Sequence, residues 1–148
     1  KWLSKLGPEP LGNNFFPEVL KASLKRKKSQ VKTALLDQKV LAGLGNIYVN
    51  EAIFLTKINP RVKVNNIPIR KIYALVSNIK KVLKKAIKQG GSSIKNFNNI
   101  EGNKGNFQQF FNVYGRQGKC CTRSNCKGII RKIRISNRST FFCEICQK

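Results

Sequence analysis

Four of the five cysteines have the spacing of a tetrahedral metal site. The five occupy positions 120, 121, 126, 143 and 146 of a 148-residue chain. Cys143 and Cys146 form a C-x2-C knuckle, and 16 residues separate Cys126 from Cys143. Close cysteines on both sides of such an interval are typical of zinc ribbons, in which four thiolates surround one Zn²⁺. Because four protein ligands close the coordination shell, we expect a structural zinc ion.

The fourth ligand has to be chosen between Cys120 and Cys121. Cys121 gives a C-x4-C knuckle with Cys126, which lies within the usual range, whereas Cys120 would need five intervening residues. We therefore predict Cys121, Cys126, Cys143 and Cys146 as ligands and leave Cys120 free or in a packing position. A disulfide framework is the alternative, but the odd number of cysteines and the absence of a secretion signal argue against it.

Two other places have the chemistry to bind an anion. The sequence Gly43-Leu44-Gly45-Asn46 directly precedes a predicted helix, and glycine lets a phosphate approach the unpaired N–H groups of a helix N-terminus. Asn46 could cap this helix or donate its amide to a phosphate oxygen, unless the turn is only a packing joint. Arg138 lies at or beside the tip of a predicted hairpin, where a guanidinium could bind phosphates or stay solvated.

Four helices are predicted to position these residues. The first begins at Pro17, and the second covers Ser29 to about Asp37 with Ser29 as its cap. A third runs from about residue 46 to 56, so that two helices flank the glycine turn. The fourth, 69–88, has the clearest periodicity, because apolar residues recur at helical spacing along one face at Ile72, Val76, Ile79, Leu83 and Ile87.

The rest of the chain changes character twice. Residues 92–119 are rich in Ser, Asn, Gly and Gln, which predicts a long loop followed by a short helix or an irregular segment. From Cys120 the pattern alternates as in a β-hairpin, with a turn at Asn137-Arg138. The expected fold is therefore mainly α, followed by a small β-hairpin zinc ribbon.

The charge favours a polyanionic partner. Thirty Lys and Arg residues against six Asp and Glu give a formal net charge of +24. Such an excess suits nucleic acid, because each neutralised phosphate releases counterions. We find no apolar run long enough for a membrane span, and no amphipathic helix suited to a membrane surface. The chain begins with Lys1 and contains no Met, so we expect it to be part of a longer protein.

Several segments resemble the C-terminal half of bacterial formamidopyrimidine-DNA glycosylases. They cover nearly the whole chain, in the family's order: LGPEPL (6–11), KTALLDQKVLAGLGNIYVNEAIF (32–54), QGGSSIKNF (89–97), NVYGRQGK (112–119) and the cysteine-rich end (121–148). The resemblance implies an interdomain linker remnant (1–16), a helix–two-turn–helix DNA-binding domain (17–112) and a zinc-finger hairpin (113–148). It also implies a monomeric bacterial cytoplasmic protein that binds damaged double-stranded DNA.

The resemblance also assigns roles to individual residues. Asn46 matches a phosphate-binding asparagine, and Lys27 matches a DNA-contacting position. Arg138 matches a zinc-finger arginine that binds the phosphates beside the lesion and donates a proton during δ-elimination. Lys95 begins a segment, 95–102, that matches a loop closing over the everted base. Cys121, Cys126, Cys143 and Cys146 match the zinc ligands, although the family's first knuckle is more often C-x2-C.

The implied activity is bifunctional: excision of oxidised purines such as 8-oxoguanine and formamidopyrimidines, then strand cleavage by β,δ-elimination. The family's N-terminal proline nucleophile, its adjacent glutamate and an assisting lysine have no counterpart here. We therefore expect this chain alone to bind DNA and to excise little or nothing, without its catalytic N-terminal domain. The alternatives are an endonuclease-eight-type glycosylase for oxidised pyrimidines and a non-enzymatic zinc-ribbon nucleic-acid binder.

Overall fold

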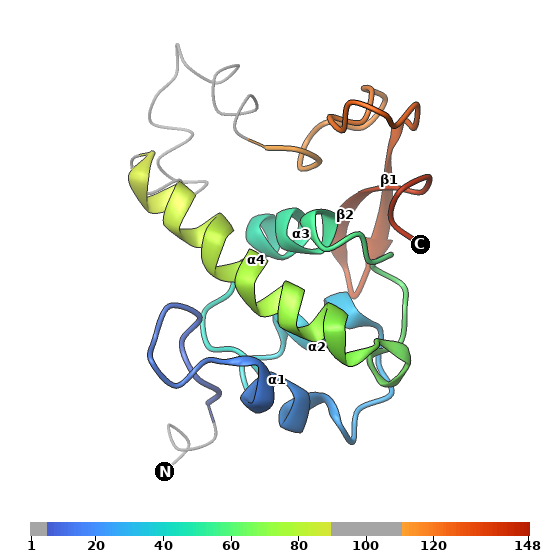
Figure 1. Cartoon of the computed structure of the whole chain (residues 1–148). Helices are drawn as coiled ribbons and strands as arrows, with labels where there is room; N and C mark the ends of the chain where they lie inside the picture. The colour runs from blue at the N-terminus through green and yellow to red at the C-terminus, as the bar shows by residue number, and fades with distance from the viewer. Residues whose placement is uncertain (1–5, 90–110) are drawn as a thin grey trace.

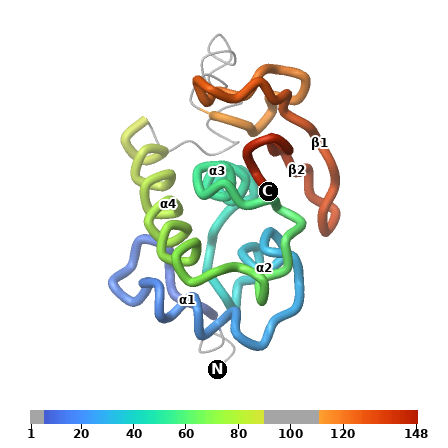
Figure 2. Tube along the Cα trace, turned by 45° about the vertical axis from the view of Figure 1, so that its right-hand side comes forward, coloured from blue at the N-terminus to red at the C-terminus, as the bar shows by residue number. Residues whose placement is uncertain are grey.

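The computed structural model describes residues 6–89 and 111–148 as a helical body with a β-hairpin beside it (Figures 1 and 2). This arrangement confirms the predicted fold class, mainly α with a small hairpin. Lys95 and the segment 95–102 lie outside the described residues. The elements, in chain order, are α1 (Pro17–Leu24), α2 (Val31–Leu36), α3 (Asn46–Leu55), the short 3₁₀ helix η2 (Val64–Asn66), α4 (Ile69–Lys88), β1 (Ile130–Ile135) and β2 (Arg138–Cys143).

The helical body is built on α3 and α4. The long helix α4 packs against both α3 and α1, and Figure 1 shows it crossing in front of α3. The apolar stripe predicted for 69–88 faces this core over its first half, with Ile72, Val76 and Ile79 buried. Towards the end of α4 the stripe leaves the core, and Ile87 is 62% exposed.

The start of the described chain packs on the helical body. Phe15 is fully buried, and the Gly7 N–H donates to the Gln38 carbonyl at 2.8 Å. A Cβ at Gly7 would lie 2.5 Å from the Val40 backbone, so this close approach requires glycine. The part of the expected linker that the structure describes, residues 6–16, therefore contributes to the core.

Helix α2 is shorter than predicted, and its cap differs. It begins at Val31 rather than near Ser29, and neither Ser29 nor Gln30 forms a side-chain cap. Instead the Ser29 carbonyl accepts from the Val64 N–H, and Gln30 forms a β-bridge with Lys63. Tertiary pairing with the segment after α3 thus replaces the local cap that the sequence favoured.

The hairpin is antiparallel and turns one residue earlier than predicted. Ile135 pairs with Arg138, so the turn residues are Ser136 and Asn137, and both have positive φ (52° and 62°). Two left-handed residues are the signature of a tight two-residue hairpin turn. Arg138 is consequently the first residue of β2, held by the strand ladder rather than by the loop.

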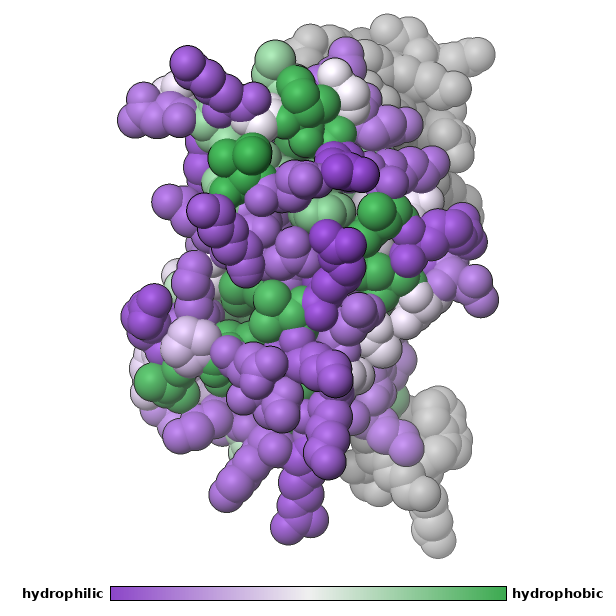
Figure 3. Space-filling model, turned by 90° about the vertical axis from the view of Figure 1, so that its right-hand side faces the viewer, coloured by the Kyte–Doolittle hydropathy of each residue, from purple (hydrophilic) through white to green (hydrophobic). Residues whose placement is uncertain are grey.

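The face shown in Figure 3 is mostly hydrophilic, with hydrophobic side chains in small separate patches. Within the described ranges the ion pairs are Lys27–Asp37 and Arg131–Glu144, so most cations there lack an acidic partner. No helix among the described residues combines the length and the apolar character that a membrane span requires.

Candidate nucleic-acid interface and metal centre

The glycine turn leaves the N-terminus of α3 open. Gly43 has a φ of +81°, a conformation that favours glycine, and Gly45 precedes the helix without a side-chain cap. Asn46 is therefore the first residue of α3 and does not cap it. The unpaired N–H groups at this end are available to an anion, which the helix dipole also favours.

The structure brings Asn46 and Arg138 to the same surface hollow. This hollow has a volume of about 260 Å³, and its lining includes Leu36, Gln38 and the turn residues Gly43 to Asn46 together with Arg138. The two residues are 92 positions apart in sequence. Arg138 is exposed, so its guanidinium is free to meet a ligand at the helix N-terminus. The arrangement suits a phosphate group, which both a guanidinium and an amide can bind.

Three side chains from α2 and α3 fix the start of β2. The Ser139 carbonyl accepts from Lys32 Nζ at 2.9 Å, from Asn46 Nδ2 at 3.1 Å and from Asn50 Nδ2 at 3.5 Å. Asn50 Oδ1 accepts from the Phe141 N–H at 2.9 Å. The position of the adjacent Arg138 therefore depends on both helices that flank the turn.

Lys32 is a buried lysine next to the start of β2, and its pKa is unusually low. Its side chain is fully buried, and its Nζ also donates to Thr140 Oγ1 at 2.6 Å. Burial, and then the charge of Arg138, lower the pKa of Lys32 from its ordinary 10.5 to about 7. A protonated Lys32 thus adds positive charge beneath the hollow at neutral pH, but part of the population lacks that proton.

The four predicted cysteine ligands form one cluster. The sulfurs of Cys121, Cys126, Cys143 and Cys146 all lie within 4.8 Å of one another. Cys121 and Cys146 are 3.8 Å apart, and Cys126 and Cys143 are 3.5 Å apart. Zn–S bonds of about 2.3 Å in a tetrahedron place neighbouring sulfurs about 3.8 Å apart, so the cluster fits a zinc ion. Cys120 is exposed and is not part of it.

Burial keeps two of these thiols protonated to a higher pH than usual, so a metal ion would have to displace their protons. Burial raises the pKa of Cys121 to about 12 and raises that of Cys146, whereas the backbone N–H of Gly128 lowers the pKa of Cys126. Buried thiolates are costly in the absence of a metal, and a divalent cation offsets that cost directly.

Comparison with known proteins identifies the helical part. Residues 6–98 match the model of the formamidopyrimidine-DNA glycosylase H2TH domain. The chain belongs to this family. Among curated relatives, the formamidopyrimidine-DNA glycosylase of Ruegeria pomeroyi is 49% identical over 148 residues, which is 100% of this chain and 52% of the relative. That of Shewanella woodyi is 45% identical over 145 residues, 98% of this chain and 53% of the relative.

Solved structures give the same result for the H2TH domain and the hairpin together. The Lactococcus lactis enzyme bound non-covalently to DNA with an AP site superposes with a TM-score of 0.83 at 37% identity, over 99% of this chain and 51% of that one. Its complex with DNA containing FAPY-dG gives 0.84 at 39%, over 99% and 52%. The chain therefore spans about half the length of the relatives it matches.

Lys27 does not line the hollow of the H2TH domain but contacts Asp37, between the lining residues Leu36 and Gln38. Its Nζ is 3.2 Å from Asp37 Oδ2, and both side chains are about one-third exposed. Asp37 follows α2 directly and also accepts from the Lys39 N–H, so this pair braces the start of the turn. The sequence-predicted residues that the structure describes thus fall into three places: the Asn46–Arg138 hollow, the cysteine cluster and the Lys27–Asp37 pair.

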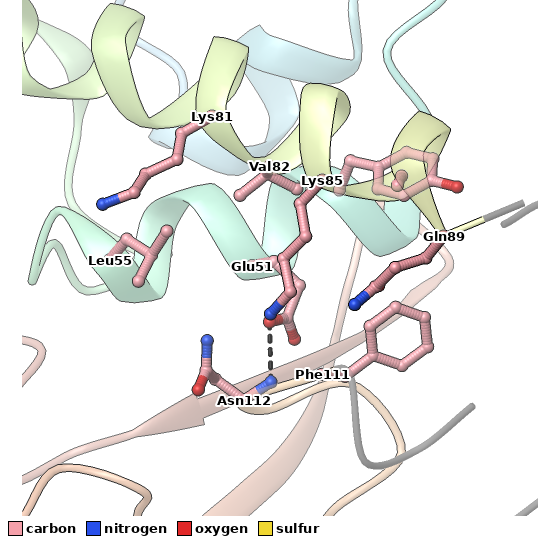
Figure 4. Close-up of a pocket in the computed structure, with 10 residues that line it drawn as sticks. Glu51, Leu55, Lys81, Val82, Lys85, Gln89, Phe111 and Asn112 are labelled. Carbon is pink, nitrogen blue, oxygen red and sulfur yellow. Dashed lines mark hydrogen bonds between the residues drawn. The ribbon is translucent and has the colours of Figure 1, made fainter. Parts of the chain in front are cut away.

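Glu51 is a buried acid of the H2TH domain that sequence reasoning missed. Its carboxylate accepts from three consecutive backbone N–H groups, those of Asn112, Val113 and Tyr114, at 2.7, 2.9 and 2.9 Å. Burial raises the pKa of Glu51, and the three N–H groups oppose that effect. Glu51 also borders a cavity of about 140 Å³ between α3 and α4 (Figure 4). A single acid within a mostly apolar helix was the available signal.

Gln147 has a comparable structural role beside the cysteine cluster. It is fully buried, its Oε1 accepts from the Cys143 N–H at 2.8 Å, and its Nε2 donates to the Ile58 carbonyl at 3.0 Å. It therefore attaches the second cysteine knuckle to the segment that follows α3.

Proposed function

We propose that this chain is the damaged-DNA-binding half of a base-excision-repair glycosylase that removes oxidised purines and cleaves the abasic strand by β,δ-elimination. The observation that supports this most directly is the convergence of Asn46 and Arg138 on one hollow at the N-terminus of α3. The relatives at 45–49% identity are formamidopyrimidine-DNA glycosylases. The similar solved structures hold DNA containing an AP site or FAPY-dG.

The residues of the hollow have complementary roles on a DNA backbone. Asn46 Nδ2 uses one hydrogen on the Ser139 carbonyl, which leaves its second hydrogen and the open N–H groups of α3 for a phosphate. Arg138 supplies the charge and a forked donor for the same or the neighbouring phosphate. The family resemblance also makes Arg138 the candidate proton donor in δ-elimination.

We propose that the cysteine cluster holds one structural zinc ion. Cys121, Cys126, Cys143 and Cys146 would be its four ligands and would leave no open position for catalysis. When bound, the ion would stabilise the two knuckles and thereby the hairpin that carries Arg138. The chain would contact DNA also through Lys27 and, outside the described residues, Lys95.

The chemistry of excision would require groups that these residues do not supply. A Schiff base at C1′ needs an unprotonated amine beside the lesion. Lys32 has the lowered pKa for this, but it is fully buried and bonded to Ser139 and Thr140. We therefore propose that the 148 residues alone bind DNA without excising a base, and that the nucleophile belongs to the catalytic N-terminal domain of this family.

The test combines binding and trapping on matched duplexes. Fluorescence anisotropy would compare an intact duplex, one with a single abasic site and one with a single 8-oxoguanine, each at two salt concentrations. We expect salt-dependent binding with preference for the abasic duplex, no borohydride-trapped adduct and no base release. Equal affinity for all three duplexes would favour a non-enzymatic nucleic-acid binder. A trapped adduct or base release would show that the chain carries its own nucleophile.

A further inference from the structure

Arg123 lies inside the first cysteine knuckle and contacts both the metal centre and α3. One guanidinium nitrogen, Nη1, donates to the Cys146 sulfur at 2.8 Å, and the other, Nη2, donates to the Phe54 carbonyl at 2.5 Å. The guanidinium carbon is 3.9 Å from the centre of the Phe54 ring. One side chain between Cys121 and Cys126 therefore reaches the second knuckle and the C-terminal end of α3 at the same time.

Each of these contacts has a physical reason to be strong. Four thiolates around a divalent cation carry a net charge of −2, so a cationic donor to one sulfur stabilises the loaded site. The Phe54 carbonyl belongs to the last turn of α3, where the helix dipole favours a positive charge. The Phe54 ring is buried, and a guanidinium stacked on it at this distance gains a cation–π interaction.

The contacts with the Cys146 sulfur, the Phe54 carbonyl and the Phe54 ring together require a planar group with several donors, such as a guanidinium. Arginine offers several donors in one plane and a flat face for the ring, whereas the ammonium of lysine is a compact point charge. Arg123 is half-buried. Its contacts with Cys146 and Phe54 therefore fix its direction, unlike those of an exposed arginine.

We propose that Arg123 is a positioning residue of the metal site, which holds the Cys146 sulfur and fastens the first knuckle to the end of α3. This inference rests on the proposed metal binding by the cysteine cluster. It assigns the residue two separable effects. The charge of Arg123 beside the Cys146 sulfur stabilises the metal-loaded site. The guanidinium, stacked on the Phe54 ring and bonded to its carbonyl, makes the end of α3 more rigid when the metal is bound.

The experiment would measure metal affinity and the spectrum of the site in the full chain. Co²⁺ would be titrated while its thiolate charge-transfer and d–d bands are recorded, and Zn²⁺ affinity would come from competition with a chelator. Arg123→Gln is expected to weaken binding of both ions tenfold to a hundredfold and to shift the charge-transfer band. Arg134→Gln, which removes an exposed arginine near the tip of the same hairpin, is the matched control and is expected to change neither.

The second effect would be tested by hydrogen exchange at residues 52–56, with and without Zn²⁺. In the unmodified chain the metal should slow exchange there. Arg123→Lys is expected to recover part of the metal affinity, because it restores a charge near the sulfur, without recovering this protection. This variant also tests the proposal if Arg123→Gln fails to fold.

The outcomes separate this inference from the metal site itself. If Arg123→Gln binds metal as tightly as Arg134→Gln and keeps the same cobalt spectrum, the role assigned to Arg123 is wrong while the metal site stands. If the unmodified chain takes up neither Zn²⁺ nor Co²⁺, the metal site is wrong and the role of Arg123 is overturned with it.

Discussion

At the residue scale, the hollow at the start of α3 depends on buried side chains as well as on the residues that line it. Asn46 and Arg138 line the hollow, but Lys32 and Asn50 determine where the strand that carries Arg138 lies. Within the described residues the Asn46 Oδ1 atom is buried without a hydrogen-bond partner. An acceptor in that state is expensive, and functional sites commonly retain such groups.

Removing the Arg138 side chain should lower both the affinity for DNA and the dependence of that affinity on salt. Arg138→Ala is expected to reduce affinity for an abasic duplex by about tenfold or more and to lower the salt slope by about one, because one phosphate contact is lost. The measurement is anisotropy between 50 and 200 mM salt. Arg70→Ala removes an equal charge from the first turn of α4. A loss as large with that control would mean that net charge alone accounts for the effect.

The buried lysine should make stability depend on pH. Above pH 7 the folded state releases the proton of Lys32, whereas the unfolded chain keeps it up to about 10.5. The unfolded state then binds more protons, so the free energy of unfolding from this group rises with pH across that window, by at most about 1.4 kcal/mol per pH unit. Urea melts from pH 6.5 to 10 would show this rise.

Lys32→Met is the comparison for that series. It should lack this component and be more stable than the parent near pH 6.5, because the Ser139 carbonyl keeps Asn46 and Asn50 as donors. Parallel stability curves for parent and variant would contradict a lowered lysine pKa.

At the element scale, α3 organises the molecule because most of its circumference is buried. Asn46 and Asn50 bind β2, Glu51 binds the segment before the cysteine cluster, and Phe54 contacts Arg123. A helix buried on all sides normally presents apolar side chains. Here the polar side chains are retained because each one hydrogen-bonds to a segment outside the helical body, Asn46 and Asn50 to β2 and Glu51 to residues 112–114.

Glu51→Gln tests that attachment. Glutamine has the same shape, but its amide nitrogen would face backbone N–H donors that now bond to a carboxylate oxygen. We expect a loss of about 1–3 kcal/mol in the free energy of unfolding, measured by urea denaturation. The matched control is Glu18→Gln, an exposed acid on α1, which should change stability by less than about 0.5 kcal/mol. Similar losses for the two would argue against a special role.

The same substitution should be severe at Gly128 and mild at Gly43. A Cβ at Gly128 would lie 2.5 Å from the Cys143 sulfur, so Gly128→Ala should displace a metal ligand and weaken zinc retention severely. A Cβ at Gly43 meets nothing within 4 Å, so Gly43→Ala should cost only about 1 kcal/mol through its left-handed backbone. Zinc release followed with a colorimetric chelator would distinguish them. Equal release from both would contradict the steric argument.

The sequence was informative wherever a periodicity or a spacing determined the element. Helix α4 was predicted with its observed bounds, and the four cysteines that it singled out form one cluster. The cap of α2 was misplaced because the backbone before it pairs with a segment distant in sequence, and the hairpin turn was placed one residue late because Ser136 and Asn137 are the two residues that adopt positive φ. Glu51 and Arg123 were missed because their partners are a backbone segment and a sulfur that only the fold brings near.

At the scale of the whole molecule, the residues that the structure describes form two separate hydrophobic clusters. One lies among the helices, and the other joins the hairpin, two of the cysteines and Phe54. The hairpin cluster is small, so we expect it to depend on the metal for much of its stability.

Chelation should therefore affect the two clusters unequally. After treatment with a strong chelator we expect far-UV circular dichroism to retain most of the helical signal, while hydrogen exchange in 130–143 accelerates and abasic-duplex binding falls at least tenfold. Restoring Zn²⁺ should reverse both changes, and Mg²⁺ at the same concentration serves as the control ion. Simultaneous loss of all helical signal would mean that the molecule unfolds as one unit.

Phe54 belongs to α3 in the chain but to the hairpin cluster in space. The boundary expected between residues 112 and 113 therefore does not separate two self-sufficient pieces. A truncated chain that stopped at Asn112 would leave the Phe54 ring without the Arg123, Val113 and Phe141 side chains around it. Such a fragment should self-associate and precipitate as its concentration rises, even though every helix of the H2TH domain is present. Dissection or grafting of the DNA-binding helices thus has to carry the hairpin with them.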